Sequence, residues 1–167
     1  MRIVPTLSLS AALALAASVS QAAAPTAAAT LAGAGVHGVV TFVASGDAVD
    51  VHVVADGLAP GSVHGIHVHE TGACTGPDFA SAGGHFNPGH QPHGALDHAH
   101  HAGDMPSVTA DAAGHVDVRF ALAASRIDGE QGFIGHSVVL HASADDYVTQ
   151  PSGNSGARIA CGVIAAQ

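Results

Sequence analysis

The chain has 167 residues, of which 47% are hydrophobic and only 4% are aromatic, with no Trp. This length suits one domain, and a core built from Ala, Val and Gly favours a sheet-rich fold over a helix bundle. The 13 Asp and Glu residues face only four basic residues, and all four of these are Arg. Nucleic acid and anionic membrane surfaces are therefore poor partners, because both are bound through clustered basic residues.

Histidine is the unusual residue in this composition, with 14 copies. A histidine surplus alone is equally typical of a polar surface and of a metal-buffering tract. The spacing of the histidines has to distinguish these readings.

The first 22 residues have the pattern of a secretory signal peptide. Arg2 gives a short positive start, an apolar stretch runs over 7–19, and Ser20-Gln21-Ala22 has the small-x-small form of a cleavage site. The apolar stretch is shorter than the roughly 20 residues that a membrane span needs. We therefore expect cleavage after Ala22 and export to the periplasm.

Export changes how the two cysteines are interpreted. Cys74 and Cys161 are the only pair available, and an oxidising compartment allows them to form a disulfide. Closing a loop of this length stabilises the fold by about 4–5 kcal/mol in the chain-entropy model, less any native strain. The alternative is two buried free thiols.

Short strand-like runs separated by Gly- and Asp-marked turns make up the rest of the chain. Residues 23–32 are Ala-rich and of low complexity, so we expect a flexible lead-in there and a single domain over 33–167. No run outside the leader has helical periodicity over ten or more residues. The pattern predicts an all-β antiparallel sandwich or barrel, with strands at 36–43, 49–55, 63–69, 115–122, 137–142 and 158–164.

Two groups of histidines have metal-ligand spacing. Side chains two apart on a strand share a face, so His67 and His69 project together, and His141 on a later run is able to complete their set. Nitrogen ligands with open access suit Cu(II). The stretch between His69 and Ala113 is too long for an idle connection, and three imidazoles with one carboxylate form the closed shell typical of structural Zn²⁺. That stretch offers His85, His93, His98, His100, His101 and Asp104.

Four segments together resemble the copper,zinc superoxide dismutases. They are G-I-H-V-H-E at 65–70, G-G-H-F-N-P at 83–88, H-A-G-D at 101–104 and G-N-S-G-A-R-I-A-C-G-V-I at 153–164. The resemblance covers nearly the whole mature chain in the same order. It implies an eight-stranded antiparallel Greek-key β-barrel with two long functional loops, and bound copper and zinc.

The resemblance also implies roles for individual residues. Copper would be held by His67, His69, His85 and His141, and zinc by His85, His93, His101 and Asp104, with His85 as the shared bridge. Asp145 would orient a copper ligand and a zinc ligand together, as partners outside the ligand set commonly do. Arg158 would dock the superoxide anion by charge-assisted hydrogen bonds. The implied reaction converts two superoxide anions to O₂ and H₂O₂ as the copper is alternately reduced and oxidised.

Some features leave alternatives open. His98 or His100 could replace His101 as the zinc ligand, and otherwise these two and His90 are interpreted as solvated or as adventitious metal binders. We interpret His64 as structural, and the remaining histidines (His37, His52, His115 and His136) as surface or hydrogen-bonded residues. Asp78 and Asp146 are interpreted as ordinary loop carboxylates. An exported copper- and zinc-binding module without turnover is the second functional reading. A zinc hydrolase is less favoured, because the chain has no H-E-x-x-H motif.

The stretch from Asp145 to Arg158 departs from the family pattern. It is shorter than in the animal enzymes and has no Lys to attract an anion from a distance. Attraction of superoxide would then rest on the metals and Arg158, which predicts a weak dependence of its association on salt. A homodimer is the favoured oligomeric state.

Overall fold

The computed structural model describes residue 24 and residues 26–167, and the expected signal peptide lies outside this part of the chain. Within it the fold is all-β, with one 3₁₀ turn, η1 (Ala80–Ala82). The strands are β1 (Thr26–Gly33), β2 (His37–Ser45), β3 (Ala48–Asp56), β4 (Val63–His64), β5 (Ile66–His69), β6 (Val108–Thr109), β7 (Val116–Ala123), β8 (Ser137–His141) and β9 (Arg158–Ala166).

The sheets are antiparallel and curl around one core. Seven strands form a sheet in the order β5-β8-β9-β1-β2-β3-β7, and β4 pairs with β6 in a second, two-stranded sheet. Long connections bring β9 beside β1 and β7 beside β3, as in Greek-key topologies. The run predicted as one strand over 63–69 is divided at Gly65, because β4 pairs with β6 whereas β5 pairs with β8. Counting 63–69 as one strand gives the eight strands that the family resemblance implies, and β1 and β6 are the two that the sequence pattern did not predict.

The Ala-rich segment is the main correction to the sequence analysis. Residues 26–33 form β1 instead of the flexible lead-in expected over 23–32, and the fold therefore begins before residue 33. Strand β1 pairs with β2 on one side and with β9 on the other. Its inward residues Ala27, Ala29 and Leu31 are buried. Alanine has only a weak preference for strands, but such preferences reflect the packing context more than the backbone. Pairing with a strand on each side therefore outweighs it here.

Small side chains build the core, as the composition implies. Alternate residues of β2, β3 and β7 point inward and include Val40, Phe42, Val51 and Val53. Phe42 also packs against Phe133 with ring centroids 5.6 Å apart. The opposite face of these strands is more exposed and carries polar groups such as His52 and Asp117. This inside-outside alternation is typical of an antiparallel sheet with one solvated face.

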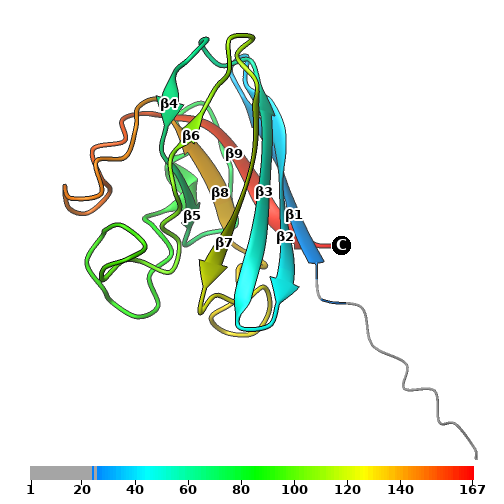
Figure 1. The fold of residues 1–167 in the computed structure, drawn as a ribbon, viewed down its shortest axis with the longest axis vertical. Coiled ribbons are helices and arrows are strands. Elements are labelled where there is room, and N and C mark those ends of the chain that lie inside the picture. The colour runs from blue at the N-terminus through cyan, green and yellow to red at the C-terminus, as the bar shows by residue number, and fades with distance from the viewer. Residues whose placement is uncertain (1–23, 25) are drawn as a thin grey trace, which may run out of the picture.

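Two long connections supply the residues around the histidines. Residues 70–107 join β5 to β6, and residues 142–157 join β8 to β9. In Figure 1 they appear in green and orange, and both project from the same side of the barrel. The strands β5 and β8 lie between them and the core. Segments far apart in the sequence thus meet at the end of one strand pair.

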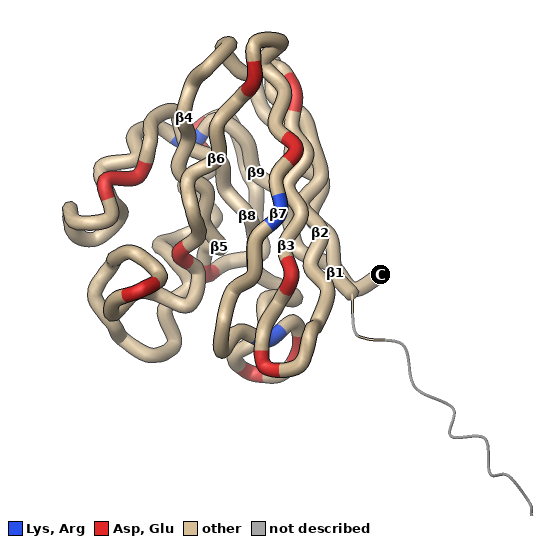
Figure 2. Tube along the Cα trace, viewed as in Figure 1, with Lys and Arg blue, Asp and Glu red and all other residues tan. Residues whose placement is uncertain are grey.

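The surface is sparse in charge, and acidic positions outnumber basic ones over strands and loops alike (Figure 2). Among the described residues, none of the helical segments is long and apolar enough to cross a membrane.

Candidate metal centre

The histidines of β5 and β8 meet because the two strands are direct neighbours. His67 pairs with Val139 and His69 with Ser137, and a register shift between Leu140 and His141 lies at the end of β8. Both β5 histidines are almost completely buried. Their ring centroids are 6.4 Å apart, which agrees with two side chains on one face of a strand.

Two groups of possible metal ligands lie side by side in the described part of the chain. In each group one ligand atom per residue lies within 4.8 Å of all the others, and every member is buried. The first group contains His67, His69, His85 and His141, and the second contains His85, His93, His101 and Asp104. These are the sets expected from the sequence, and His85 belongs to both.

His85 presents one ring nitrogen to each group. Its Nδ1 lies 2.9 Å from Asp104 Oδ1 and 3.4 Å from His101 Nδ1. Its Nε2 is buried and has no hydrogen-bond partner in the described residues. The ring stacks on His67 with centroids 3.9 Å apart. A buried polar atom without a partner is costly, so this nitrogen has the surroundings of a metal ligand.

The other members of the first group also have one ring nitrogen held by protein and the other left for a ligand. His67 Nε2 donates to Asp145 Oδ2 at 2.7 Å, and its buried Nδ1 has no partner among the described residues. His69 Nδ1 donates to the Gly83 carbonyl at 3.0 Å, and His141 Nδ1 to the Gly156 carbonyl at 3.3 Å. Their Nε2 atoms face each other at 3.4 Å. Such hydrogen bonds fix the ring orientation and tautomer of metal-binding histidines.

The protonation states fit metal binding as well. Burial lowers the pKa of His67 to about 4, against the opposing effect of its hydrogen bond to Asp145. Burial likewise lowers the pKa of His69 to about 2 and that of His141 to about 3. These rings are therefore neutral near pH 7, which is the form that binds metal.

The second group is organised around one carboxylate oxygen. Oδ1 of Asp104 lies 2.9–3.3 Å from the Nδ1 atoms of His85, His93 and His101. Burial alone would raise the pKa of Asp104, but hydrogen bonds from His85 and the His101 backbone outweigh it and lower that pKa. Oδ2 accepts from the backbone N–H groups of Gly94 and His101. Three imidazoles and one carboxylate around one point fit the closed shell of a structural zinc ion.

Asp145 connects the two groups. Its Oδ2 accepts from His67 Nε2, and its Oδ1 accepts from His93 Nε2 at 3.0 Å and from the Tyr147 backbone at 2.7 Å. Burial would raise the pKa of Asp145, but these hydrogen bonds outweigh it and lower the pKa. One carboxylate thus orients a ring from each group. The family resemblance implies these two contacts, and the orienting role of Asp145 in the metal-loaded protein stays a prediction.

The crowded histidines are separated by the fold. His101 is buried within the second group, whereas His98 is exposed and faces Asp97, and His100 Nδ1 donates to the carbonyl of His98. His64 agrees with a structural reading, because its Nδ1 donates to the His141 carbonyl at 2.7 Å. Asp146 accepts hydrogen bonds from Val148 and Thr149 in its own loop.

Arg158 begins β9 and lies in the cavity that opens over the first group. This cavity of about 720 Å³ is lined by His69, His85, His141 and Arg158, among others. The guanidinium donates to the carbonyls of Phe79 and Gly83, both at 2.6 Å. The Gly83 carbonyl also accepts from His69, so one backbone atom connects the arginine to a possible ligand.

Cys74 and Cys161 form a disulfide, as expected. It joins β9 to the loop that carries Phe79, and Phe79, Ala82 and Val139 pack around it. Arg158 is three residues before Cys161. The segment that carries the arginine is therefore tied to the 70–107 loop both covalently and by hydrogen bonds.

Sequence reasoning did not single out some contributors to the site. The Gly83 carbonyl and the backbone of Tyr147 act through main-chain atoms, which no side-chain motif reveals. Gly153 has a positive φ of 63°, and a Cβ there would overlap Asp145 Oδ1 and approach His93 Nε2 to 2.6 Å. The motif G-N-S-G contains this glycine, but only the packing against Asp145 explains the need for it.

The fold and the two clusters define a class: an antiparallel β-protein with a pair of metal sites that share one histidine. Residues 36–164 match the family described as copper/zinc superoxide dismutase (SODC). The chain is 40% identical over 144 residues to the "Superoxide dismutase [Cu-Zn]" of Deinococcus radiodurans, covering 78% of both chains. It is 45% identical over 124 residues to the "Superoxide dismutase-like protein YojM" of Bacillus subtilis, covering 71% of this chain and 63% of that one.

A solved structure has the same fold. The crystal structure of the clock protein EA4 matches with a TM-score of 0.79 and 35% identity, and covers 88% of this chain and 98% of that protein. The chain therefore belongs to the copper/zinc superoxide dismutase family. Its enzyme class is superoxide dismutase, with copper and zinc as cofactors.

Proposed function

We propose that this protein converts superoxide to O₂ and H₂O₂ at a copper ion held by His67, His69, His85 and His141. Zinc binds next to it, through His85, His93, His101 and Asp104. The observation that carries this assignment is His85, whose two ring nitrogens face the two clusters and whose buried Nε2 has no partner in the described residues. Bound copper supplies the alternating one-electron oxidation and reduction of two superoxide anions.

The residues of the chain supply binding, orientation and a proton. Arg158 is the cation in the wall of the cavity and docks the anion by charge-assisted hydrogen bonds. Its two hydrogen bonds to Phe79 and Gly83 hold the guanidinium in place. Nε2 of His85 would take up one proton in the first half of the cycle and give it to the product in the second, and the other proton of H₂O₂ would come from water. Asp145 and the backbone carbonyls keep the other rings in their ligating tautomers.

Reconstitution tests this function. The protein loaded with copper and zinc is assayed for superoxide dismutation beside His141→Ala, with metal content measured in both. We expect dismutation in the wild type and loss of both bound copper and activity in His141→Ala, with zinc retained. Full activity in His141→Ala would refute the copper assignment.

A metal-binding protein without turnover is the second candidate, and the "superoxide dismutase-like" name of the Bacillus relative favours keeping it. In that case the wild type would bind both metals and give no dismutation above free copper.

We also propose that the protein works in the periplasm. The disulfide supports an oxidising compartment, and extracellular relatives from Drosophila melanogaster and Caenorhabditis elegans match at 39% and 37% identity. We further propose the homodimer expected from the sequence, and measurement of the molar mass by light scattering tests it.

A further inference from the structure

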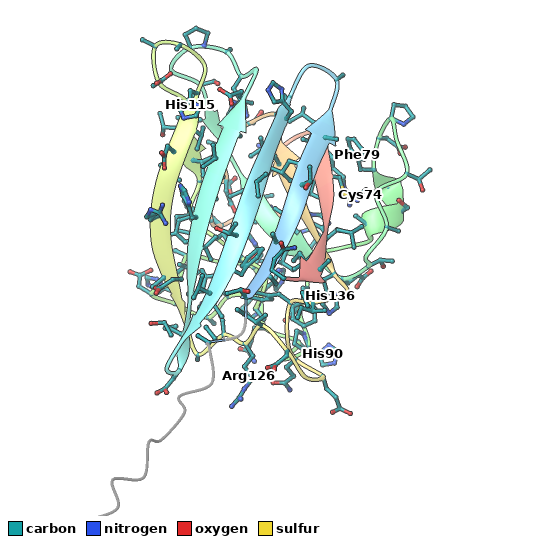
Figure 3. The ribbon with its side chains drawn as sticks, turned by 90° about the vertical axis from the view of Figure 1, so that its right-hand side faces the viewer. Cys74, Phe79, His90, His115, Arg126 and His136 are labelled. Carbon is teal, nitrogen blue, oxygen red and sulfur yellow. A yellow bond between two sulfur atoms is a disulfide. The ribbon has the colours of Figure 1, made fainter. Side chains whose placement is uncertain are left out.

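The cavity over the first histidine cluster has two more histidines in its wall, which the proposed reaction does not use. His90 and His136 line the same opening as His69, His141 and Arg158. Figure 3 labels both at one end of the molecule. They come from different segments: His90 from the 70–107 loop, and His136 from the residue before β8.

His136 is held with one nitrogen free. Its Nδ1 donates to the Glu70 carbonyl at 2.8 Å, and its backbone carbonyl accepts from Ile164. The ring packs on Phe86, with centroids 4.1 Å apart. Nε2 has no hydrogen-bond partner within residues 26–167. A ring whose Nδ1 is held by a carbonyl leaves Nε2 as the nitrogen that can meet a ligand, which is the arrangement of a metal-binding histidine.

His90 stands further out on the wall. It is exposed, and its ring makes no hydrogen bond to any described residue. Its backbone has a φ of 49°, in the left-handed region that is uncommon outside glycine. The turn is closed by hydrogen bonds between Asn87 and Gln91, and by the His90 N–H to the Asn87 carbonyl. An unusual backbone conformation that holds an unpaired imidazole at a cavity is a reason to look for a function.

The charge of the chain as a whole, more than that of the cavity wall, favours the approach of a cation. Besides histidines, the ionisable residues that line the cavity are Glu70 and Arg158, whose formal charges cancel. The chain as a whole carries a formal net charge of −9. A field of this sign attracts cations and raises their concentration near the surface. Imidazole nitrogens are good ligands for copper.

We propose that His90 and His136 form a capture site for copper ions on the way into the protein, before His69, His85 and His141 bind the metal. The ion binds first at the exposed imidazole of His90 and at Nε2 of His136. It then moves inward along the cavity to the final ligands. Binding at the rim keeps a weakly held ion close to the final ligands, so the second step is effectively intramolecular. The inference rests on the copper site proposed above.

Loading kinetics test the capture site apart from turnover. Aqueous Cu(II) is mixed with zinc-loaded, copper-free protein near pH 7, and the appearance of the copper ligand-field absorption is followed in time, with the final spectrum recorded by electron paramagnetic resonance. The variants are His90→Asn, which accepts the left-handed backbone, and His136→Gln, which keeps a donor for the Glu70 carbonyl. His98→Asn is the matched control, because His98 is an exposed histidine of the same loop but does not line the cavity.

We expect His90→Asn and His136→Gln each to slow the second-order loading step by about tenfold, because each removes one imidazole that holds the ion close to the final ligands, and an intramolecular second step can gain about 10²–10⁴-fold. Final copper content, the resonance spectrum and kcat/KM of the loaded variants stay as in the wild type, and His98→Asn loads normally. Equal loading rates in all four proteins would overturn the proposal, as would an equal slowing in His98→Asn. Normal loading with a reduced kcat/KM would assign these histidines to substrate binding instead. Failure of the wild type to bind copper at all would refute the copper site itself, along with the capture site.

Discussion

Asp145 is the residue through which one small change reaches both metal sites. In Asp145→Asn the side chain keeps one acceptor oxygen and gains an N–H donor. The ring nitrogens of His67 and His93 both need an acceptor there, at 2.7 and 3.0 Å. One of the two rings then faces a donor and changes tautomer, which protonates the Nδ1 atom that would bind the metal.

The size of the effect follows from the position of this carboxylate outside the ligand set. Removing such a partner typically weakens metal affinity by about 10–100-fold, which is about 1.4–2.8 kcal/mol. The affinity for copper should fall if the His67 ring changes tautomer, and the affinity for zinc should fall if the His93 ring does. Competition with a chelator of known affinity, read out as copper and zinc bound per chain, measures both constants.

The control for this substitution is Asp146→Asn. Asp146 is the next residue, is exposed, and accepts hydrogen bonds only from Val148 and Thr149 of its own loop. Its replacement should leave both metal affinities within a factor of about two, because its side chain bonds only to Val148 and Thr149 and to no possible ligand. Unchanged affinity for both metals in Asp145→Asn would show that the carboxylate does not orient the ligands.

Three further predictions concern substrate, acid and salt. Arg158→Ala should lower kcat/KM by about 10–100-fold, because hydrogen bonds to charged groups contribute about 1.5–3 kcal/mol. The electron paramagnetic resonance spectrum of the bound copper should stay unchanged. An unaltered kcat/KM would exclude substrate docking by this residue. In the metal-free protein, the buried rings of His67, His69 and His141 have pKa values below that of an unfolded histidine. The unfolded state therefore binds more protons below about pH 6.5, and the free energy of unfolding should fall by up to about 4 kcal/mol per pH unit toward pH 4. Urea titrations at several pH values check this, and a flat profile would contradict neutral, buried rings. Salt should change kcat/KM of the loaded enzyme only weakly, since the 142–157 segment has no Lys and long-range attraction is small; a steep fall with ionic strength would refute that reading.

The strands and the donor set were largely predictable from the sequence. All six runs expected as strands form strands with ends within about two residues of the predicted ones, although the run over 63–69 is divided in two. Alternating Val residues and Gly-marked turns are local signals. The kinds of ligand available were also local signals. Imidazoles spaced two apart, and a carboxylate three residues after a histidine, restrict the chemistry to metals that accept nitrogen and oxygen.

Only the tertiary structure decided which groups meet. The segment over 26–33 looks featureless on its own, and it becomes a strand because β2 and β9 supply partners on both sides. His98, His100 and His101 are nearly equivalent in the sequence, and the turn that buries His101 against Asp104 separates them. The two faces of His85 and the contact of Gly153 with Asp145 depend on elements far apart in the chain. The sequence by itself therefore determined which atoms are available as ligands, whereas burial and long-range pairing decided which nitrogen of each ring is left for a metal.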